Sequence, residues 1–155
     1  MAVEIERKFL VKEGWQPKNA GVRIAQGYLS SVPERTVRVR IKGEKGYLTV
    51  KGKNQGISRA EFEYEIPVAD AEAMLKLCEQ PPVEKTRYLE KYEGHTWEID
   101  IFAGANKGLR VAEIELPSED TDFLKPAWAG MEVSGDARYY NSSLSLHPYQ
   151  QWAAD

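Results

Sequence analysis

Cysteine and histidine are scarce in this 155-residue chain, which has one cysteine, Cys78, and two histidines, His95 and His147. A single cysteine cannot form an internal disulfide bond, so we expect a reducing, cytoplasmic environment. Cys78 lies in an apolar helical stretch and is expected to pack there, and both histidines are expected at the surface. The sequence therefore contains no cluster of thiols or imidazoles for metal binding or catalysis.

Other signals of function are also missing. The chain has no signal-peptide pattern and no apolar run long enough to cross a bilayer, so no membrane partner is expected. Its net charge of −3 argues against a nucleic acid held by overall positive charge. It has no P-loop, no GxGxxG fingerprint and no pattern that singles out a nucleophilic serine. The oligomeric state stays open, a homodimer included.

Short segments that alternate between apolar and polar residues make up most of the chain. Eight of them are predicted strands, separated by turns such as "GEKG" and "AGANKG". Short loops favour antiparallel pairing between successive strands. We therefore predict an α+β protein with one domain over residues 1–155, mainly an antiparallel sheet with a few helices. The predicted strands are 3–12, 22–29, 35–42, 47–53, 59–66, 84–93, 96–102 and 109–116.

Three helical segments are predicted beside the strands. The first, 70–79, has Asp70 as its N-cap and ends at Pro81-Pro82. The second, 118–124, begins with an acidic first turn, which suits a helix N-terminus. The third, 141–152, is broken near Pro148.

Charged residues two positions apart recur on strand after strand. Residues two apart share one face of a strand, so the charges share one face and the intervening apolar residues the other. Within each strand most of these charges have one sign, and like charges opposite each other on neighbouring strands would repel. The groups are Glu4/Glu6/Lys8, Arg38/Arg40/Lys42, Lys51/Lys53, Glu61/Glu63/Glu65, Lys85/Arg87, Glu98/Asp100 and Glu113/Glu115.

Two arrangements of such a sheet fit this pattern. In the simpler one the charged side faces water, either only solvated or as a protein-interaction surface. In the other the eight strands close into a barrel, which removes the sheet edges, and the charged side lines its interior. Charges gathered in a lumen are costly without a ligand. Carboxylates bind Mg²⁺ or Mn²⁺ and basic side chains bind phosphate oxygens, so a metal-bound polyanion would neutralise both sets.

Motifs in order along nearly the whole chain resemble the CYTH superfamily, the triphosphate tunnel metalloenzymes. The segment "EIERK", residues 4–8, matches the ExExK signature of that superfamily. ExExK is a short pattern with many chance matches, and it is the ordered set that is specific. The other matching segments are "QGYL", "TVRVR", "LTVKGK", "VEKTRY", "WEIDIF", "AEIEL" and "EVSGDARYYN".

The resemblance implies a closed eight-stranded antiparallel barrel whose charged tunnel binds a triphosphate and a divalent metal, Mg²⁺ or Mn²⁺. By motif position, the implied catalytic residues are Glu4, Glu6 and Lys8, and the implied metal ligands are Glu4, Glu6, Asp100, Glu113 and Glu115. The implied substrate-binding residues are Lys8, Arg38, Arg40, Lys51, Lys85, Arg87 and Arg138. Lys53, Glu61 and Glu63 match less well, and the two acids could instead orient basic neighbours. Arg138 either reaches a phosphate or pairs with an acid.

The small bacterial single-domain members that this chain resembles include enzymes that hydrolyse inorganic tripolyphosphate. The resemblance thus implies metal-dependent hydrolysis of a linear triphosphate to diphosphate and phosphate. Thiamine triphosphatase and class IV adenylyl cyclase remain alternatives within the superfamily. A non-catalytic polyphosphate-binding module is a further alternative, although binding alone needs mainly the bases and not the acidic set.

Overall fold

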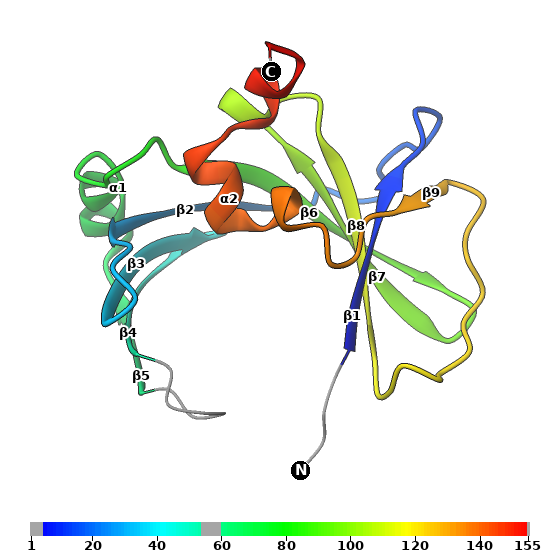
Figure 1. Cartoon of the computed structure of the whole chain (residues 1–155), viewed down its shortest axis with the longest axis horizontal. Coiled ribbons are helices and arrows are strands. Elements are labelled where there is room, and N and C mark those ends of the chain that lie inside the picture. Colours follow the sequence, from blue (N-terminus) through cyan, green and yellow to red (C-terminus); the bar gives the residue numbers. More distant parts are fainter. Residues whose placement is uncertain (1–4, 54–59, 155) are drawn as a thin grey trace.

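The computed structural model describes residues 5–53 and 60–154, and in this part of the chain strands predominate (Figure 1). The strands are β1 Ile5–Val11, β2 Val22–Ser30, β3 Arg35–Lys42, β4 Lys45–Gly52, β5 Glu61–Ile66, β6 Val83–Tyr92, β7 His95–Phe102, β8 Arg110–Leu116 and β9 Ala129–Glu132. Eight of them correspond to the predicted segments, of which 3–12 and 59–66 begin outside the described residues. The ninth, β9, was not predicted.

The strands form one sheet in the order β5-β4-β3-β2-β6-β7-β8-β1-β9. Every pair of neighbours is antiparallel. Tight turns connect β3 to β4 and β6 to β7, and Gly43 and Gly94 have positive φ angles of 62° and 83° in these turns. The predicted fold class, a mainly antiparallel sheet with a few helices, is confirmed.

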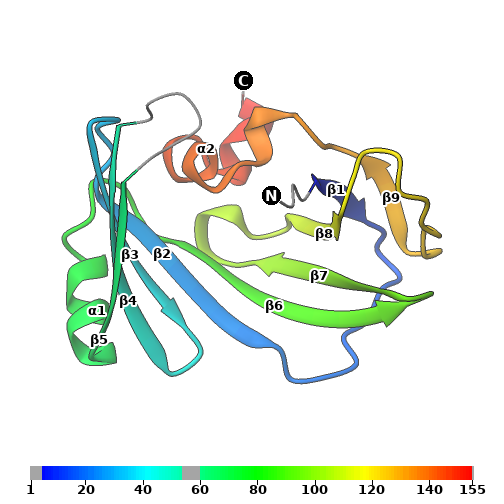
Figure 2. The ribbon, with the colours of Figure 1, turned by 90° about the horizontal axis from the view of Figure 1, so that it is seen from below.

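The sheet is strongly bent, but it is not the closed eight-stranded barrel that was expected. Within the described residues, β5 and β9 are its two end strands and do not pair with each other. The short strand β9 adds to β1 instead, where Phe9 faces Glu132 and Val11 faces Ala129. Figures 1 and 2 show the C-terminal helix α2, Asn141–Leu146, between the two arms of the bent sheet, on its concave side.

The outward, apolar face of the sheet is covered in two places. Helix α1, Val68–Leu75, packs over Ala25, Val39 and Ile41 on the β2–β3 part of the sheet. The loop after β1 and the segment before β9 cover the β7–β8–β1 part, where Trp97 is completely buried. No helix in the described part of the chain is long and apolar enough to span a membrane.

The predicted helices had mixed outcomes. Helix α1 begins after Pro67, so Asp70 lies in its first turn and is not the N-cap. The predicted helix 118–124 was wrong, because this segment consists of a bend, a turn and irregular chain. Phe123 from it packs edge-on against Phe9 and Trp97, with ring centroids 6.1 and 5.9 Å apart. A helix this short is marginal by itself, so this aromatic packing decides its conformation.

The C-terminal segment covers one end of the concave face. Helix α2 and the 3-10 helix η3, Tyr149–Ala154, are separated near Pro148, which confirms the predicted break. Leu144 and Tyr139 form a buried cluster with Val83, Phe102 and Val111. Each of these three strand residues lies an even number of positions from the charged residues of its strand and therefore points to the same side. The tail thus packs on the charged side of the sheet.

We expect Gly46→Ala to destabilise the protein, because an added Cβ would lie 2.9 Å from the Cβ of Ala71 and 3.1 Å from the carbonyl oxygen of Ile66. Pushing α1 away from β4 in this manner should lower the free energy of unfolding by about 1–3 kcal/mol. Gly14→Ala is the matched control, since a Cβ there meets nothing within 4 Å. Urea unfolding of both variants checks this, and equal stability would contradict the packing described.

Candidate active site

The strand register brings nearly all the predicted site residues onto the concave face. Lys8 lies opposite Glu113, Glu113 lies opposite Glu98, and Glu6 lies opposite Glu115. Further along the sheet, the register aligns Arg87 with Asp100, Arg38 with Thr49 and Thr49 with Glu63. The charged residues of this face include Glu6, Lys8, Arg38, Arg40, Lys51, Glu61, Glu63, Lys85, Arg87, Glu98, Asp100, Glu113 and Glu115. Glu4 lies outside the described residues.

Two arginines of β3 carry buried N–H groups that have no acceptor. The Nε atoms of Arg38 and Arg40 are inaccessible to solvent and have no hydrogen-bond partner in the described part of the chain. Burial, together with the positive charges of Arg38 and Arg87, lowers the pKa of Arg40. A buried, unpaired donor costs free energy. This part of the face is therefore suited to an incoming anion that accepts these hydrogen bonds.

Asp100 lies among the bases, and both of its oxygens are engaged. Arg87 donates to it through Nε at 2.8 Å and Nη2 at 2.9 Å, and the Lys85 Nζ lies 2.8 Å from Oδ2. The side chains of Lys85 and Asp100 are only 3% and 2% exposed. Burial alone would raise the pKa of Asp100, but the hydrogen bond from Arg87 and the charge of Lys85 lower it. Asp100 was predicted as a metal ligand, whereas in this structure it neutralises and orients two phosphate-binding candidates.

Acidic residues gather at the other end of the face. Glu98, Glu113, Glu115 and Thr96 line a hollow of about 210 Å³. Lys8 reaches Glu113 at 3.7 Å. Burial and the neighbouring carboxylate of Glu6 raise the pKa of Glu113 to about 7. Two acids that raise each other's energy in this way favour an added positive charge.

These carboxylates suit a hard divalent cation, but they do not form a complete cage for one. Among the described residues, no three acids, histidines or cysteines lie close enough together to hold a metal ion. Mg²⁺ typically keeps several waters and binds through one or two carboxylates together with substrate phosphates. The donor set of Glu6, Glu113 and Glu115 fits that mode of binding, in which the substrate completes the coordination.

The remaining predicted residues divide into two groups. Lys51 lies 3.9 Å from Glu61, and Arg38 lies 3.9 Å from Glu63, so these two acids pair with bases of the same face. Within the described residues, Arg138 makes no ion pair or hydrogen bond with the charged face. Its side chain is 62% exposed and binds Asp136 at 2.8 Å, which is the second of the two roles expected for it.

Several residues near the site were not predicted from sequence. Tyr28 and Thr49 line a small hollow together with Arg38 and Lys51, and Thr49 donates to Glu63 at 3.0 Å. Ser134 and Tyr140 line a second hollow of about 310 Å³ beside Glu6 and Lys8. The strand parity of Tyr28 and Thr49 could have identified them. Ser134 and Tyr140 lie in the "EVSGDARYYN" segment of the motif set, but only Arg138 of that segment was given a role.

The fold and this face define a β-sheet protein with an ionic concave surface. The CYTH domain family matches residues 2–144 of the chain. An inorganic triphosphatase of Acetivibrio thermocellus is 51% identical over 154 residues, which cover 98% of this chain and 99% of the relative. An inorganic triphosphatase of Nitrosomonas europaea is 40% identical over 147 residues, covering 92% and 97% of the two chains.

A solved structure agrees with these sequence matches. The crystal structure of an inorganic triphosphatase superposes with a TM-score of 0.81 and 37% identity, over 94% of this chain and 96% of its own. The chain therefore belongs to the CYTH family, and the resemblance inferred from the motifs is confirmed.

Asp100→Asn tests whether this residue serves the bases. In metal-free buffer, we expect the free energy of unfolding to fall by about 3–5 kcal/mol, because buried Lys85 loses its counter-charge. Glu98→Gln is the matched control. Glu98 also binds Arg87, at 2.6 Å, but its side chain is 31% exposed, so its loss should cost at most about 1 kcal/mol. If Asp100→Asn keeps full stability in EDTA and changes only the metal requirement, Asp100 is a metal ligand instead.

The raised pKa of Glu113 predicts a pH dependence of stability in the metal-free protein. The folded state holds this proton up to about pH 7, whereas the ordinary pKa is 4.5. Its contribution to stability is therefore complete below about pH 4.5 and is lost as the pH rises through 7, by roughly 3 kcal/mol in all. Urea unfolding in EDTA between pH 5 and 8 should show this loss, and Glu113→Gln should remove it. An unchanged slope in Glu113→Gln would contradict the assignment.

Proposed function

We propose that the protein hydrolyses inorganic tripolyphosphate to diphosphate and phosphate on the concave face of its sheet, with Mg²⁺ or Mn²⁺ as cofactor. The chain is an inorganic triphosphatase, a phosphoric anhydride hydrolase, like the relatives that match it at 51% and 40% identity over nearly its whole length. The choice of tripolyphosphate, the metal, the single domain over 1–155 and a cytoplasmic location are our proposals. No nucleic-acid or membrane partner is proposed.

The observation that carries this proposal is the pair of buried guanidinium Nε atoms in Arg38 and Arg40 that lack acceptors. They lie on the same face as Lys85 and Arg87, which Asp100 orients. Arginine binds phosphate oxygens through charge-assisted hydrogen bonds, often in pairs. A linear chain of phosphates would supply acceptors along the whole row, which a single small anion would not.

The basic and the acidic residues of the concave face would have different roles in the reaction. The bases Arg38, Arg40, Lys51, Lys85 and Arg87 would bind the phosphate chain and stabilise the leaving diphosphate. One or two carboxylates of the set Glu6, Glu113 and Glu115 would hold the metal together with the substrate. When bound, this ion would supply positive charge that offsets the charge developing on the phosphates during transfer.

Hydrolysis needs a water molecule in line with the bond that breaks. We propose that Glu6, together with Glu4 outside the described residues, orients this water and accepts its proton as the new P–O bond forms. The bond to the leaving diphosphate breaks in the same step, so no covalent intermediate with the protein is required. Lys8, 3.7 Å from Glu113, lies among the acids and would contact the phosphate under attack.

A phosphate-release assay with Mg²⁺ or Mn²⁺ tests the proposal. We expect turnover of tripolyphosphate in preference to ATP, thiamine triphosphate and diphosphate, and we expect EDTA to abolish it. Arg40→Gln should lower kcat/KM about 10- to 100-fold, because it removes a charged hydrogen bond to phosphate. It should not lower the stability of the ligand-free protein, since the Arg40 Nε has no partner there to lose.

Arg23→Gln is the matched control, because Arg23 lies on the opposite face of β2, where it binds Glu72 and Glu84. This variant should keep full activity. Cyclic AMP formation from ATP would instead establish an adenylyl cyclase, and preference for thiamine triphosphate a thiamine triphosphatase. Stabilisation by tripolyphosphate without any turnover would establish a binding module.

A further inference from the structure

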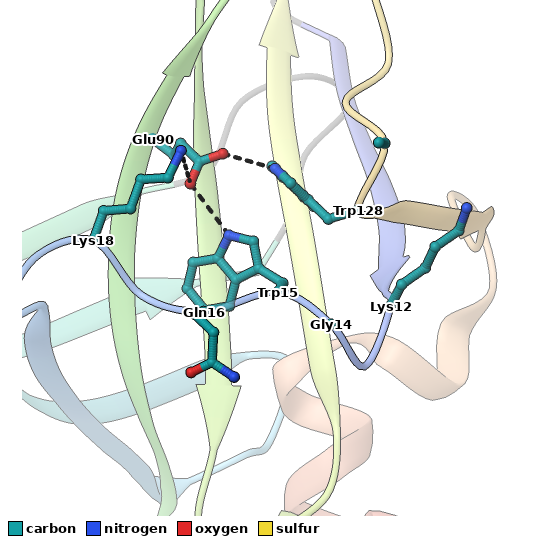
Figure 3. A pocket seen from close by; sticks show the side chains of 8 residues that line it. Lys12, Gly14, Trp15, Gln16, Lys18, Glu90 and Trp128 are labelled. Atoms are coloured by element: carbon teal, nitrogen blue, oxygen red, sulfur yellow. Dashed lines mark hydrogen bonds and ion pairs between the residues drawn. The ribbon is translucent and has the colours of Figure 1, made fainter.

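A further cavity, separate from the hollows of the charged face, lies on the outer face of the sheet (Figure 3). Its volume is about 520 Å³, within the range of small-molecule pockets. Trp15 and Trp128 line it, together with Glu90 of β6. Glu90 and Arg87 lie an odd number of positions apart on β6, so their side chains point to opposite faces. A ligand in this pocket would therefore not occupy the site proposed for tripolyphosphate.

The walls of the pocket are held in place without a ligand. The backbone N–H of Lys12 donates to the carbonyl oxygen of Trp128 at 2.8 Å and joins the two loops that carry the tryptophans. Arg110 donates to the carbonyl oxygen of Trp15 at 2.9 Å, and its guanidinium lies 5.6 Å from the centre of the Trp15 ring. A pre-formed pocket costs little ordering free energy when a ligand binds.

The pocket presents indole rings and not indole N–H groups. The Nε1 atoms of Trp15 and Trp128 both donate to Glu90, at 3.2 and 2.7 Å, as Figure 3 shows. Both oxygens of Glu90 are thus engaged, and its side chain is only 10% exposed. What remains for a ligand is apolar ring surface, mainly that of Trp128 because Trp15 is only 5% exposed, and flat groups pack well on such a surface.

The charges at the pocket favour an anion. Lys12 and Lys18 line it, against the single carboxylate of Glu90. Lys18 lies 3.6 Å from Glu90 but is 74% exposed, so it can turn toward a ligand at little cost. Glu90 keeps its negative charge, but Lys18 already pairs with it, so Lys12 leaves the balance of charge at the pocket positive.

We propose that this pocket binds a small molecule that combines a flat apolar ring system with one acidic group. The ring would lie against Trp15 and Trp128, and the acid would lie near Lys12 and Lys18. This site is separate from the phosphate site and does not depend on the proposed function.

The four tryptophans allow a direct test, because each gives one indole N–H signal in a ¹⁵N–¹H spectrum. The probe is 1-anilinonaphthalene-8-sulfonate, a flat anion, added to the full chain in EDTA. We expect the signals of Trp15 and Trp128 to shift while those of Trp97 and Trp152 do not, and excess tripolyphosphate to leave the shifts unchanged. The uncharged N-phenyl-1-naphthylamine should bind at least about fivefold more weakly.

Two sets of variants separate the rings from the charges. Lys12→Gln combined with Lys18→Gln should weaken binding of the sulfonate at least about fivefold, whereas the control Lys107→Gln, at an exposed lysine elsewhere, should not. Ala127→Phe should block the pocket and remove the shifts. The proposal is overturned if millimolar probe leaves Trp15 and Trp128 unshifted, if the neutral compound binds equally well, or if tripolyphosphate displaces the probe.

Discussion

Like charges confined to one face of a bent sheet are the constraint on which this protein depends. Strand geometry sends every second side chain to the same side, and the antiparallel register aligns these side chains across β1 and β3 to β8. Bending the sheet brings the rows closer together, so their repulsion grows. The result is a face with most of its bases at one end and most of its acids at the other, which the proposed anion and cation would balance.

Asp100 shows how the protein limits this repulsion before any ligand arrives. Lys85 is almost fully buried, and burial lowers its pKa, whereas the nearby charge of Asp100 acts in the opposite direction. Asp100 neutralises Lys85 and Arg87 and holds them in fixed directions. Arg38 and Arg40 have weaker support, since their Nε atoms have no acceptor in the described residues. The bases are therefore partly organised by the protein, and the phosphates would complete the arrangement.

Burial of side chains on the apolar face offsets the electrostatic repulsion on the charged face. Trp97, Ile99 and Ile114 are fully or almost fully buried on the outer side of β7 and β8, directly behind the acidic end. Burying large apolar side chains stabilises the fold by roughly 1.5–3 kcal/mol each, which offsets the repulsion on the other side. The covering segments carry aromatic residues from distant parts of the chain, and their packing also forms the tryptophan pocket around Glu90.

The sequence by itself determined the strands and the common face of their charges, because a period of two follows from local backbone geometry and needs no tertiary contact. The ordered motifs also identified the family. Tertiary structure decided what depends on distant segments. Within the described residues it left the sheet open at β5 and β9, kept 118–124 out of a helix by packing Phe123 against Trp97, and paired Asp100 with Lys85. Each of these outcomes depends on which side chains meet across the sheet, and their spacing along the chain does not contain that information.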